Sequence, residues 1–428
     1  MSLHARKTIF VSPLDPIADA KSISEGLAIA SPGTIVVLDA GHYSQSETNE
    51  SFPIVVPSGV SLHGVNREHC LVDGEGHGTP SFDPIDPYHS LVVLEDGTTV
   101  AEVSITNGGA NGISVLPRSR AAIRSCMITR NGQHGIYLCG GDEASVSDCR
   151  LSDNGLGQLR PTLPRGTAAR QGHHIFVEAR GGSRNRLRIT NNMMQRCFAD
   201  GIALVCFFSE NDAVSSRATI AGNTVTDCGR AGLLVSCSFG PSHNDQSVTI
   251  THNVFKKNQE TGISILPAIP LAAKVPEHNH TQVTITNNQI ESSNVCLALH
   301  GAMGEAHSNH CDAIVVGNTI TDWRLRGIHV VGALGVPKFA TRQNVVTTTV
   351  SRNVLIGRSP ALALQGVAGP TGCSLLENHV KARLLHNDTS ASEAPTVILY
   401  REDTDNSVDL SESSDSHVYS AVSLPEKA

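Results

Sequence analysis

The chain has 428 residues, with 32 lysine and arginine residues against 40 aspartate and glutamate residues, and a net charge of −8. Hydrophobic residues make up 39% of the chain and charged residues 17%, so a wholly disordered protein is excluded. The acidic balance disfavours a general nucleic-acid-binding protein. An aromatic content of 4% is low for an extended groove that stacks sugars or bases.

The N-terminal sequence and the cysteines indicate in which cellular compartment the protein is expected. Residues 1–13 contain no apolar stretch of signal-peptide length, and no run approaches the ~18 apolar residues of a membrane span. The eleven cysteines form no CxxC pair. An odd count without a signal peptide is typical of reduced thiols, so we expect a cytoplasmic protein. Cys197 with Cys228, and Cys206 with Cys237, hold equivalent repeat positions, and we expect them to be free.

From about residue 100 the chain repeats a unit whose length is mostly 30 to 34 residues. One half of the unit is a small residue followed by an apolar-x-apolar run. It recurs at 112–115, 135–138, 174–177, 201–204, 232–235, 262–265, 296–299, 327–330 and 361–364. Such alternation predicts short β-strands, and since no helical pattern separates them, βαβ units are excluded.

The other half of the unit is an apolar-x-x-Asn-x-apolar pattern. It recurs around Asn192, Asn223, Asn253, Asn288, Asn318, Asn353 and Asn378, and Cys126 and Cys149 hold the same place in the first two units. A period of this length predicts coils that stack on one another. An inward asparagine at one bend can then hydrogen-bond the asparagine one coil away, which predicts a ladder of amides.

This repeat resembles the right-handed parallel β-helix of the pectate-lyase-like superfamily. The segment 23–64 resembles an uncharacterised domain that opens many bacterial β-helix proteins. The resemblance implies an all-β, single-stranded parallel β-helix of about ten coils over residues 1–400. It also implies an N-terminal cap at about 8–33, with a short amphipathic helix at about 17–30. Residues 401–428, with seven acidic and two basic residues, are expected to form a polar, acidic tail.

The repeat also converts sequence into approximate geometry, because equivalent positions on adjacent coils lie ~5 Å apart. The position before the glycine predicts a column of His134, His173 and Asp200, and the outward positions of the strands add Tyr137 and Glu178. We expect these five side chains to share one solvent-reachable patch suited to proton transfer. His173 or His134 would be the base, Tyr137 the acid, and Asp200 or Glu178 the orienting group.

Residues 150–188 are rich in arginine. They contain eight arginines against Asp153 and Glu178, a local balance of +6, which favours an anionic ligand. The insertion 155–172 is interpreted as a flap over the patch. The predicted substrate-binding residues are Arg160, Arg165, Arg170 and Arg180. The alternative is that the arginines cover an outer sheet face and that the histidines are surface polar residues.

A second candidate site comprises His300, Arg326 and His329, with both histidines outward on adjacent coils and His307 and His310 in a nearby loop. No acidic residue has convincing metal-ligand spacing, so we predict no metal and no organic cofactor. Apolar segments at 206–208, 238–241, 266–271 and 332–337 leave the coils at similar points. They are expected to form a wall that favours a partly hydrophobic ligand or contacts in a homo-oligomer.

Three functions fit these observations. The first is a lyase or an isomerase of the epimerase type, which would use acid/base side chains without a cofactor on an anionic, carbohydrate-like substrate. The second is a cytoplasmic biosynthetic cyclase or isomerase with a smaller, partly hydrophobic substrate. The third is a non-catalytic binding or assembly protein. All three lack a nucleic-acid or membrane partner.

Overall fold

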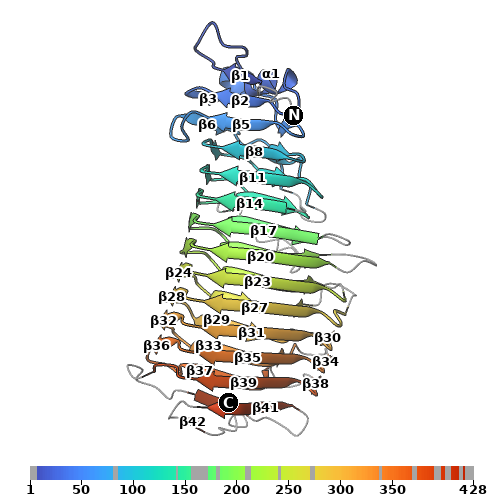
Figure 1. The fold of residues 1–428 in the computed structure, drawn as a ribbon, viewed down its shortest axis with the longest axis vertical. Helices are drawn as coiled ribbons and strands as arrows, with labels where there is room; N and C mark the ends of the chain where they lie inside the picture. The colour runs from blue at the N-terminus through green and yellow to red at the C-terminus, as the bar shows by residue number, and fades with distance from the viewer. Residues whose placement is uncertain are drawn as a thin grey trace, which may run out of the picture. The chain divides into compact units, whose positions relative to one another are not determined.

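The computed structural model describes residues 7–80, 85–140, 143–155, 172–179, 184–207, 214–239, 242–269, 275–336, 340–368, 374–389, 397–400, 406–413 and 418–419. The chain forms two compact units. Unit 1 comprises Met1–Glu178 and Ser183–Gly201, and unit 2 comprises Ala179–Gly182 and Ile202–Ala428. Each unit contains three parallel sheets, which we call A, B and C. One coil of the chain passes through a strand of sheet C, then one of sheet A, then one of sheet B (Figure 1).

Unit 1 is built from three parallel sheets. Sheet A contains β1 (Thr8–Val11), β2 (Ile35–Leu38), β5 (Ser61–Gly64), β8 (Thr98–Ala101), β11 (Arg120–Arg124), β14 (Glu143–Ser147) and β17 (Arg184–Thr190). Sheet B contains β3 (Gly41–Tyr43), β6 (Cys70–Asp73), β9 (Ser104–Thr106), β12 (Met127–Thr129), β15 (Arg150–Ser152) and β18 (Met193–Gln195). Sheet C contains β4 (Ile54–Val56), β7 (Ser90–Leu94), β10 (Asn111–Val115), β13 (Ile136–Cys139) and β16 (Ile175–Ala179).

Unit 2 repeats the same three-sheet plan. Sheet A contains β20 (Ser215–Ala221), β23 (Asp245–Thr251), β27 (His280–Thr286), β31 (His310–Val316), β35 (Val345–Ser351), β39 (His379–Leu385) and β41 (Ser407–Ser413). Sheet B contains β21 (Thr224–Thr226), β24 (Val254–Lys256), β28 (Gln289–Glu291), β32 (Thr319–Thr321) and β36 (Val354–Ile356). Sheet C contains β19 (Ile202–Phe207), β22 (Ala231–Phe239), β25 (Thr261–Ile265), β29 (Val295–His300), β33 (Arg326–Leu334), β37 (Leu362–Ala368), β40 (Val397–Tyr400) and β42 (Val418–Tyr419).

Shorter strands extend this plan in unit 2. β26 (Ala268–Ile269) pairs with β22, and a small sheet contains β30 (Ala306–His307), β34 (Ala340–Arg342) and β38 (Ser374–Leu376). The predicted all-β architecture of stacked parallel strands is therefore confirmed.

Sheets A and C differ in how their outer faces are covered. In β17, residues alternate strictly between exposed and buried, with Leu187 and Ile189 inward and arginines outward. Period-two alternation of this kind is typical of a sheet with one wet face. By contrast, every residue of β7, β10, β13 and β16 is buried. Sheet C of unit 1 is therefore covered on both faces, which determines the setting of the first candidate site.

The predicted asparagine ladder is present in unit 2 at the turn between sheets A and B. Each amide Nδ2 donates to the Oδ1 of the next asparagine at 2.9–3.0 Å. The members in order are Asn223, Asn253, Asn288, Asn318, Asn353 and Asn387. The amides also donate to backbone carbonyls of neighbouring strands, so the buried side chains are hydrogen-bonded as burial requires.

In unit 1 the same turn carries Asn192, which accepts a hydrogen bond from the Cys149 amide at 2.9 Å. Cys149 and Cys126 are buried at the equivalent turns, as the repeat predicts. Asn378, however, was assigned to the wrong turn, since the ladder continues through Asn387. It belongs to a second ladder, at the turn between sheets C and A of unit 2, that the sequence analysis missed. Its members are Asn244, Asn279, Asn309, Asn344, Asn378 and Asn406.

The N-terminal cap contains a shorter helix than expected. Helix α1 spans Ile23–Ala28 instead of about 17–30, because Ser22 caps its first turn and forms a capping box with Glu25. The buried Glu50 carboxylate also accepts hydrogen bonds from the amides of Ile23 and Ser24, at 2.6 and 3.0 Å. A second short helix, α2 (Gln45–Thr48), follows β3. The apolar side of α1 packs against β1, β2 and β4, the first strands of unit 1.

Three further findings concern the C-terminus, the helices and the cysteines. β41 pairs with β39 and β42 with β40, so strand pairing continues into the segment expected to be a polar tail. Within the described ranges, both helices are far too short to cross a membrane. The ten cysteines in the described part of the chain are buried free thiols, as predicted; Cys373 lies outside that part.

Candidate functional site

Unit 1 brings the five residues of the first predicted site together. In sheet C, Tyr137 of β13 pairs in register with Phe176 of β16, and Cys139 pairs with Glu178. His134 and His173 each lie two residues before these strands, and Asp200 also belongs to unit 1. The repeat alignment is therefore right at this point, including His173 in the position before the glycine place.

The five side chains form two closely linked groups. The Tyr137 hydroxyl donates to Glu178 Oε2 at 2.6 Å. The backbone amide of Asp200 donates to His173 Nδ1 at 3.2 Å, and the Asp200 carboxylate oxygen Oδ2 lies 3.4 Å from the same nitrogen. The backbone amide of His173 donates in turn to His134 Nδ1 at 3.3 Å. Since both Nδ1 atoms accept hydrogen bonds, the neutral imidazoles carry their proton on Nε2.

Aromatic rings fill the space between these groups. The imidazoles of His134 and His173 stack at 5.3 Å between ring centres, and the Phe176 ring lies 4.8 and 5.0 Å from them. Asn111, one coil earlier, extends the polar row because its Oδ1 accepts from the His134 amide at 3.3 Å. Asn111 precedes Gly112, the glycine of its repeat unit, so the same register contained a signal for it.

The expected exposure of this patch is wrong. The side chains of His134, His173, Asp200 and Tyr137 are 0% exposed, and Glu178 is 1% exposed. The physical reason is that sheet C of unit 1 is covered on both faces, whereas a repeat register shows only which residues stack and not what lies over them. The group in unit 1 is a buried polar network in this structure.

The arginine-rich segment does not border this network in the part of the chain that the structure describes. Arg184, Arg186 and Arg188 point outward from β17 in sheet A, where Arg186 lies 3.6 Å from Glu143. Arg150 is on sheet B and lies 3.5 Å from Glu68. These four arginines thus match the alternative interpretation, in which arginines cover outer sheet faces. The predicted ligand residues Arg160, Arg165, Arg170 and Arg180, and the predicted flap at 155–172 apart from its two end residues, lie outside the described residues.

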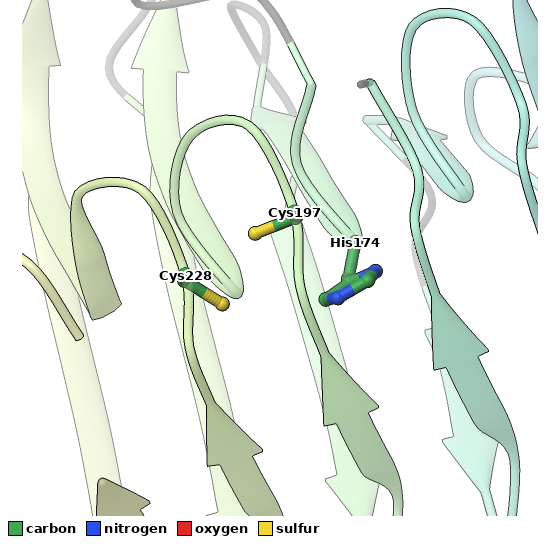
Figure 2. A group of neighbouring side chains, drawn as sticks. All are labelled: His174, Cys197 and Cys228. Carbon is green, nitrogen blue, oxygen red and sulfur yellow. The ribbon is translucent and has the colours of Figure 1, made fainter. Parts of the chain in front are cut away.

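His174 occupies the glycine place of its coil and points into unit 1. Its Nδ1 accepts a hydrogen bond from Asn154 Nδ2 at 3.1 Å, and complete burial lowers its pKa from 6.5 to about 3. Figure 2 shows its imidazole near the buried thiol of Cys197, and their potential ligand atoms lie within 4.8 Å of each other. The third side chain drawn there, Cys228, is a buried free thiol of unit 2.

Unit 2 contains the second predicted site, on the outer face of sheet C. His300 ends β29, and His329 lies in β33 between Ala298 and Ala363 of the neighbouring strands. The two imidazoles meet edge to face, with ring centres 5.9 Å apart. His329 Nε2 lies 3.1 Å from Gln365 Oε1. Both histidines and Arg326 are half-buried, so solvent reaches this group.

Burial sets the charge of both imidazoles. It lowers the pKa of His300 to about 3, with a smaller effect from the neighbouring His329. Burial also lowers the pKa of His329, and the positive charge of Arg326 acts in the same direction. Both rings are therefore neutral at neutral pH, and each retains a nitrogen lone pair for accepting a proton.

Two parts of unit 2 differ from the sequence analysis. His310 is not in a loop but in β31, where Asp312 accepts from both His280 and His310 at 2.9 Å. Gln365, the partner of His329, was not assigned a role. A signal for it was present, because Gln365 follows Val331 in the outward column of sheet C.

Among the described residues of the apolar segments, Leu266, Ala268 and Ala333 of unit 2 are buried. β22 continues to Phe239, which pairs with Ile269 of β26. Ala268, Ala302 and Ala306 form a fully buried cluster. Parts of all four predicted segments, namely 208, 240–241, 270–271 and 337, lie outside the described residues, so the apolar wall stays a prediction.

Two family models match the chain. One, described as a right-handed beta helix region, matches residues 90–267. The three-sheet coil and the asparagine ladders agree with it. The protein has the right-handed parallel β-helix fold of the pectate-lyase-like superfamily. The second model, described as a protein of unknown function (DUF1565), matches residues 17–155, which covers the cap and the first coils of the β-helix. Both resemblances expected from the sequence are confirmed.

Several solved structures share this β-helix. The Dettilon tailspike protein has a TM-score of 0.52 and 13% identity, over 92% of this chain and 68% of its own. An α-1,3-glucanase from Streptomyces thermodiastaticus has a TM-score of 0.53 and 14% identity, over 87% and 66%. A polygalacturonase from Erwinia carotovora has a TM-score of 0.53 and 12% identity, over 87% and 95%. At such identities these similarities establish the fold alone. No curated protein matches the sequence.

The two groups on the β-helix differ in the chemistry they offer. The unit 1 network contains carboxylates, a phenol and imidazoles, but it is closed to solvent. The unit 2 group contains two neutral imidazoles, a guanidinium and an amide, and it is reached by solvent. A reaction with a bulky substrate needs access, and this favours the unit 2 group.

Proposed function

We propose that this β-helix protein is a carbohydrate-acting enzyme of the lyase or epimerase type, which abstracts a proton from a uronate residue at the His329 site. Solved structures with the same fold include a polygalacturonase and an α-1,3-glucanase, which supports a carbohydrate substrate. The observation that carries the proposal is a half-buried imidazole, oriented by a hydrogen bond and placed on the strand that also carries Arg326.

His329 is the proposed base. The amide oxygen of Gln365 can only accept, so Nε2 of His329 carries the hydrogen and Nδ1 keeps its lone pair. The lowered pKa keeps that nitrogen unprotonated at neutral pH. A fixed, unprotonated imidazole is what abstraction of the proton next to a carboxylate requires.

Arg326 and His300 are the proposed supporting groups. A guanidinium neutralises the carboxylate of the uronate and stabilises the charge that develops when the proton leaves. Arg326 begins β33, three residues before His329, and is half-buried. The edge of the His300 ring packs against His329 and limits its rotation.

The residue types favour elimination or epimerisation over hydrolysis. Most glycoside hydrolases need a pair of carboxylates beside the scissile bond. The strands of sheet C in unit 2 from β19 to β37 contain no aspartate or glutamate. Carboxylates are present in the unit 1 network, but they are buried there. We therefore place the base in unit 2 and give the first predicted site, including His173, no contact with substrate.

The test is an activity screen on polygalacturonate, polymannuronate and polyglucuronate. Ultraviolet absorbance detects the unsaturated product of elimination, and proton NMR detects epimerisation. We expect His329→Ala to lower turnover about 10²–10⁴-fold, as for the loss of a general base. Arg326→Ala should lower it as well, whereas the exposed neighbouring Arg324→Ala should not. As pH is lowered, kcat/KM should decrease only below pH 6.5, because the pKa of His329 is lowered from that value.

His173→Ala tests the rival site in unit 1, and its turnover is measured on protein that remains folded. Loss of turnover in folded His173→Ala with retention in His329→Ala would move the active site to unit 1 and overturn the proposal. A wild-type protein inactive on all three polymers would also overturn it, in favour of the cyclase or the assembly protein.

A further inference from the structure

A hollow of about 340 Å³ lies on the outer face of sheet A in unit 1. Its floor and walls come from the first strands of the unit, β2, β5, β8 and β11. The lining residues are Gly33, Ile35, Gly59, Ser61, His63, Gly97, Thr99 and Arg124. The volume is within the range of small-molecule sites in proteins.

The hollow exists because residues with small side chains pair with one another on adjacent strands of sheet A. Ser61 pairs with Thr99, and the next outward column contains His63, Ala101 and Arg124. The short side chains in the middle leave a depression, and His63 and Arg124 stand at its edge. At the turn, Gly59 has a φ of 74°, and a Cβ there would lie 3.2 Å from the Cβ of Pro32. A larger residue is thus disfavoured at this margin.

Three polar side chains of the hollow, those of Arg124, Ser61 and Thr99, are available to a ligand. In the described part of the chain, the Arg124 guanidinium forms no ion pair or hydrogen bond, and neither do the hydroxyls of Ser61 and Thr99. Arg120, at the other end of β11, is different: its guanidinium forms a two-pronged pair with Asp96 at 2.8 and 3.1 Å. That pairing lowers the pKa of Asp96 to about 2. Strand β11 thus carries Arg120, whose charge is neutralised by Asp96, and Arg124, whose charge is not neutralised by an ion pair.

We infer that this hollow is a binding site for a small hydroxylated carboxylate, of the size and chemistry of one uronate residue. Arg124 pairs with the carboxylate, because a guanidinium matches its two oxygens. Ser61, Thr99 and His63 face the ring hydroxyls, since hydroxyls and imidazoles both donate and accept hydrogen bonds. The inference concerns a site built from other residues than the proposed active site, and it does not depend on catalysis at His329.

The experiment measures galacturonate binding by ligand-observed saturation-transfer NMR and by titration calorimetry. It uses the full chain carrying Arg326→Ala, which removes the proposed carboxylate partner of the active site. We expect galacturonate to bind and galactose to bind at least tenfold more weakly. Adding Arg124→Ala should weaken galacturonate binding at least tenfold. Adding the matched Arg120→Ala should leave it unchanged, because Arg120 is already paired.

Three outcomes would overturn the inference. One is equal galacturonate binding with and without Arg124. Another is equal loss of binding in Arg120→Ala and Arg124→Ala, which would indicate a diffuse charge effect. The last is phosphate or acetate binding as tightly as galacturonate with the same dependence on Arg124, which would show a simple anion site. The failure of the proposed function would appear separately, as absent turnover with binding intact.

Discussion

The outer faces of sheet C in the two units both carry polar, titratable side chains, but in different surroundings. In unit 1, Tyr137 and Glu178 pair inside sheet C, where every residue of β7, β10, β13 and β16 is buried. In unit 2, His300 and His329 occupy outward positions of equivalent strands and are only partly buried. The comparison teaches that one repeat position can hold either a packed polar network or a reachable reactive group.

The energetic consequences also differ. A buried polar group must keep its hydrogen bonds, because losing a partner costs its desolvation free energy. A half-exposed imidazole can be removed with water replacing it. Substitutions in unit 1 should therefore affect stability, whereas substitutions at the unit 2 site should affect turnover.

The largest expected effect comes from Glu178→Ala. It removes the acceptor 2.6 Å from the Tyr137 hydroxyl and leaves a cavity in a buried region, which should lower the free energy of unfolding by about 3 kcal/mol. Thermal and denaturant unfolding measure this. Tyr137→Phe, which removes only the hydroxyl, should cost about 1 kcal/mol. His329→Ala should cost about 0.5 kcal/mol or less. Equal losses in Glu178→Ala and His329→Ala would remove the distinction between the two faces.

The ladder turn gives the next largest effect. Asn288→Ala removes an amide that donates to Asn318 and to a backbone carbonyl, and should cost about 2 kcal/mol. The exposed neighbour Gln289→Ala should be nearly neutral. At the equivalent turn of unit 1, Cys149→Ala should cost less than Asn288→Ala, because a thiol is a weak hydrogen-bonding group. A Cys149→Ala variant less stable than Asn288→Ala would contradict this ranking.

Acid should destabilise unit 1 through His174. Its folded pKa of about 3 lies below the unfolded value of 6.5, so the unfolded chain binds the extra proton between these pH values. Stability should then fall as pH decreases from 6.5 toward 3, by about 1–2 kcal/mol at pH 5 for this residue alone. His300 in unit 2 has a similar shift but is half-exposed, so its share should be smaller. Unfolding at pH 7 and pH 5 for wild type, His174→Gln and His300→Gln checks the order. If His300→Gln reduced the pH dependence of the unfolding free energy more than His174→Gln did, the predicted order would be wrong.

The smallest effect concerns the thiols. If the protein resides in a reducing compartment, as we propose, denatured and unreduced protein should titrate as 11 free sulfhydryls. In the native protein the ten described thiols should react slowly, because all are buried. Burial raises the pKa of Cys296 to about 12, which suppresses its thiolate. Fewer than 11 sulfhydryls after denaturation would contradict the compartment proposal.

Much of this protein follows from sequence alone. The alternation of apolar residues determines strands, and the period determines that they stack, since each coil buries its inward side chains against the next. The asparagine pattern predicts a ladder because an inward amide needs a partner at every coil. The same register places His134 beside His173, and His300 beside His329, with no knowledge of the structure.

The exposure and the ion pairing of outward side chains were decided only by the tertiary structure, because the repeat register does not determine them. Whether an outward residue is covered depends on segments outside the repeat, so the burial of Tyr137, and of Glu178 beside it, was not visible in the pattern. The second asparagine ladder was missed although its members, like those of the first, follow residues with positive φ, such as His243 and Gln343. The pairing of Arg120 but not of Arg124 also depends on where a neighbouring turn presents Asp96. A periodic sequence determines which residues meet along a column, whereas accessibility and charge compensation depend on non-periodic contacts that only the folded chain brings together.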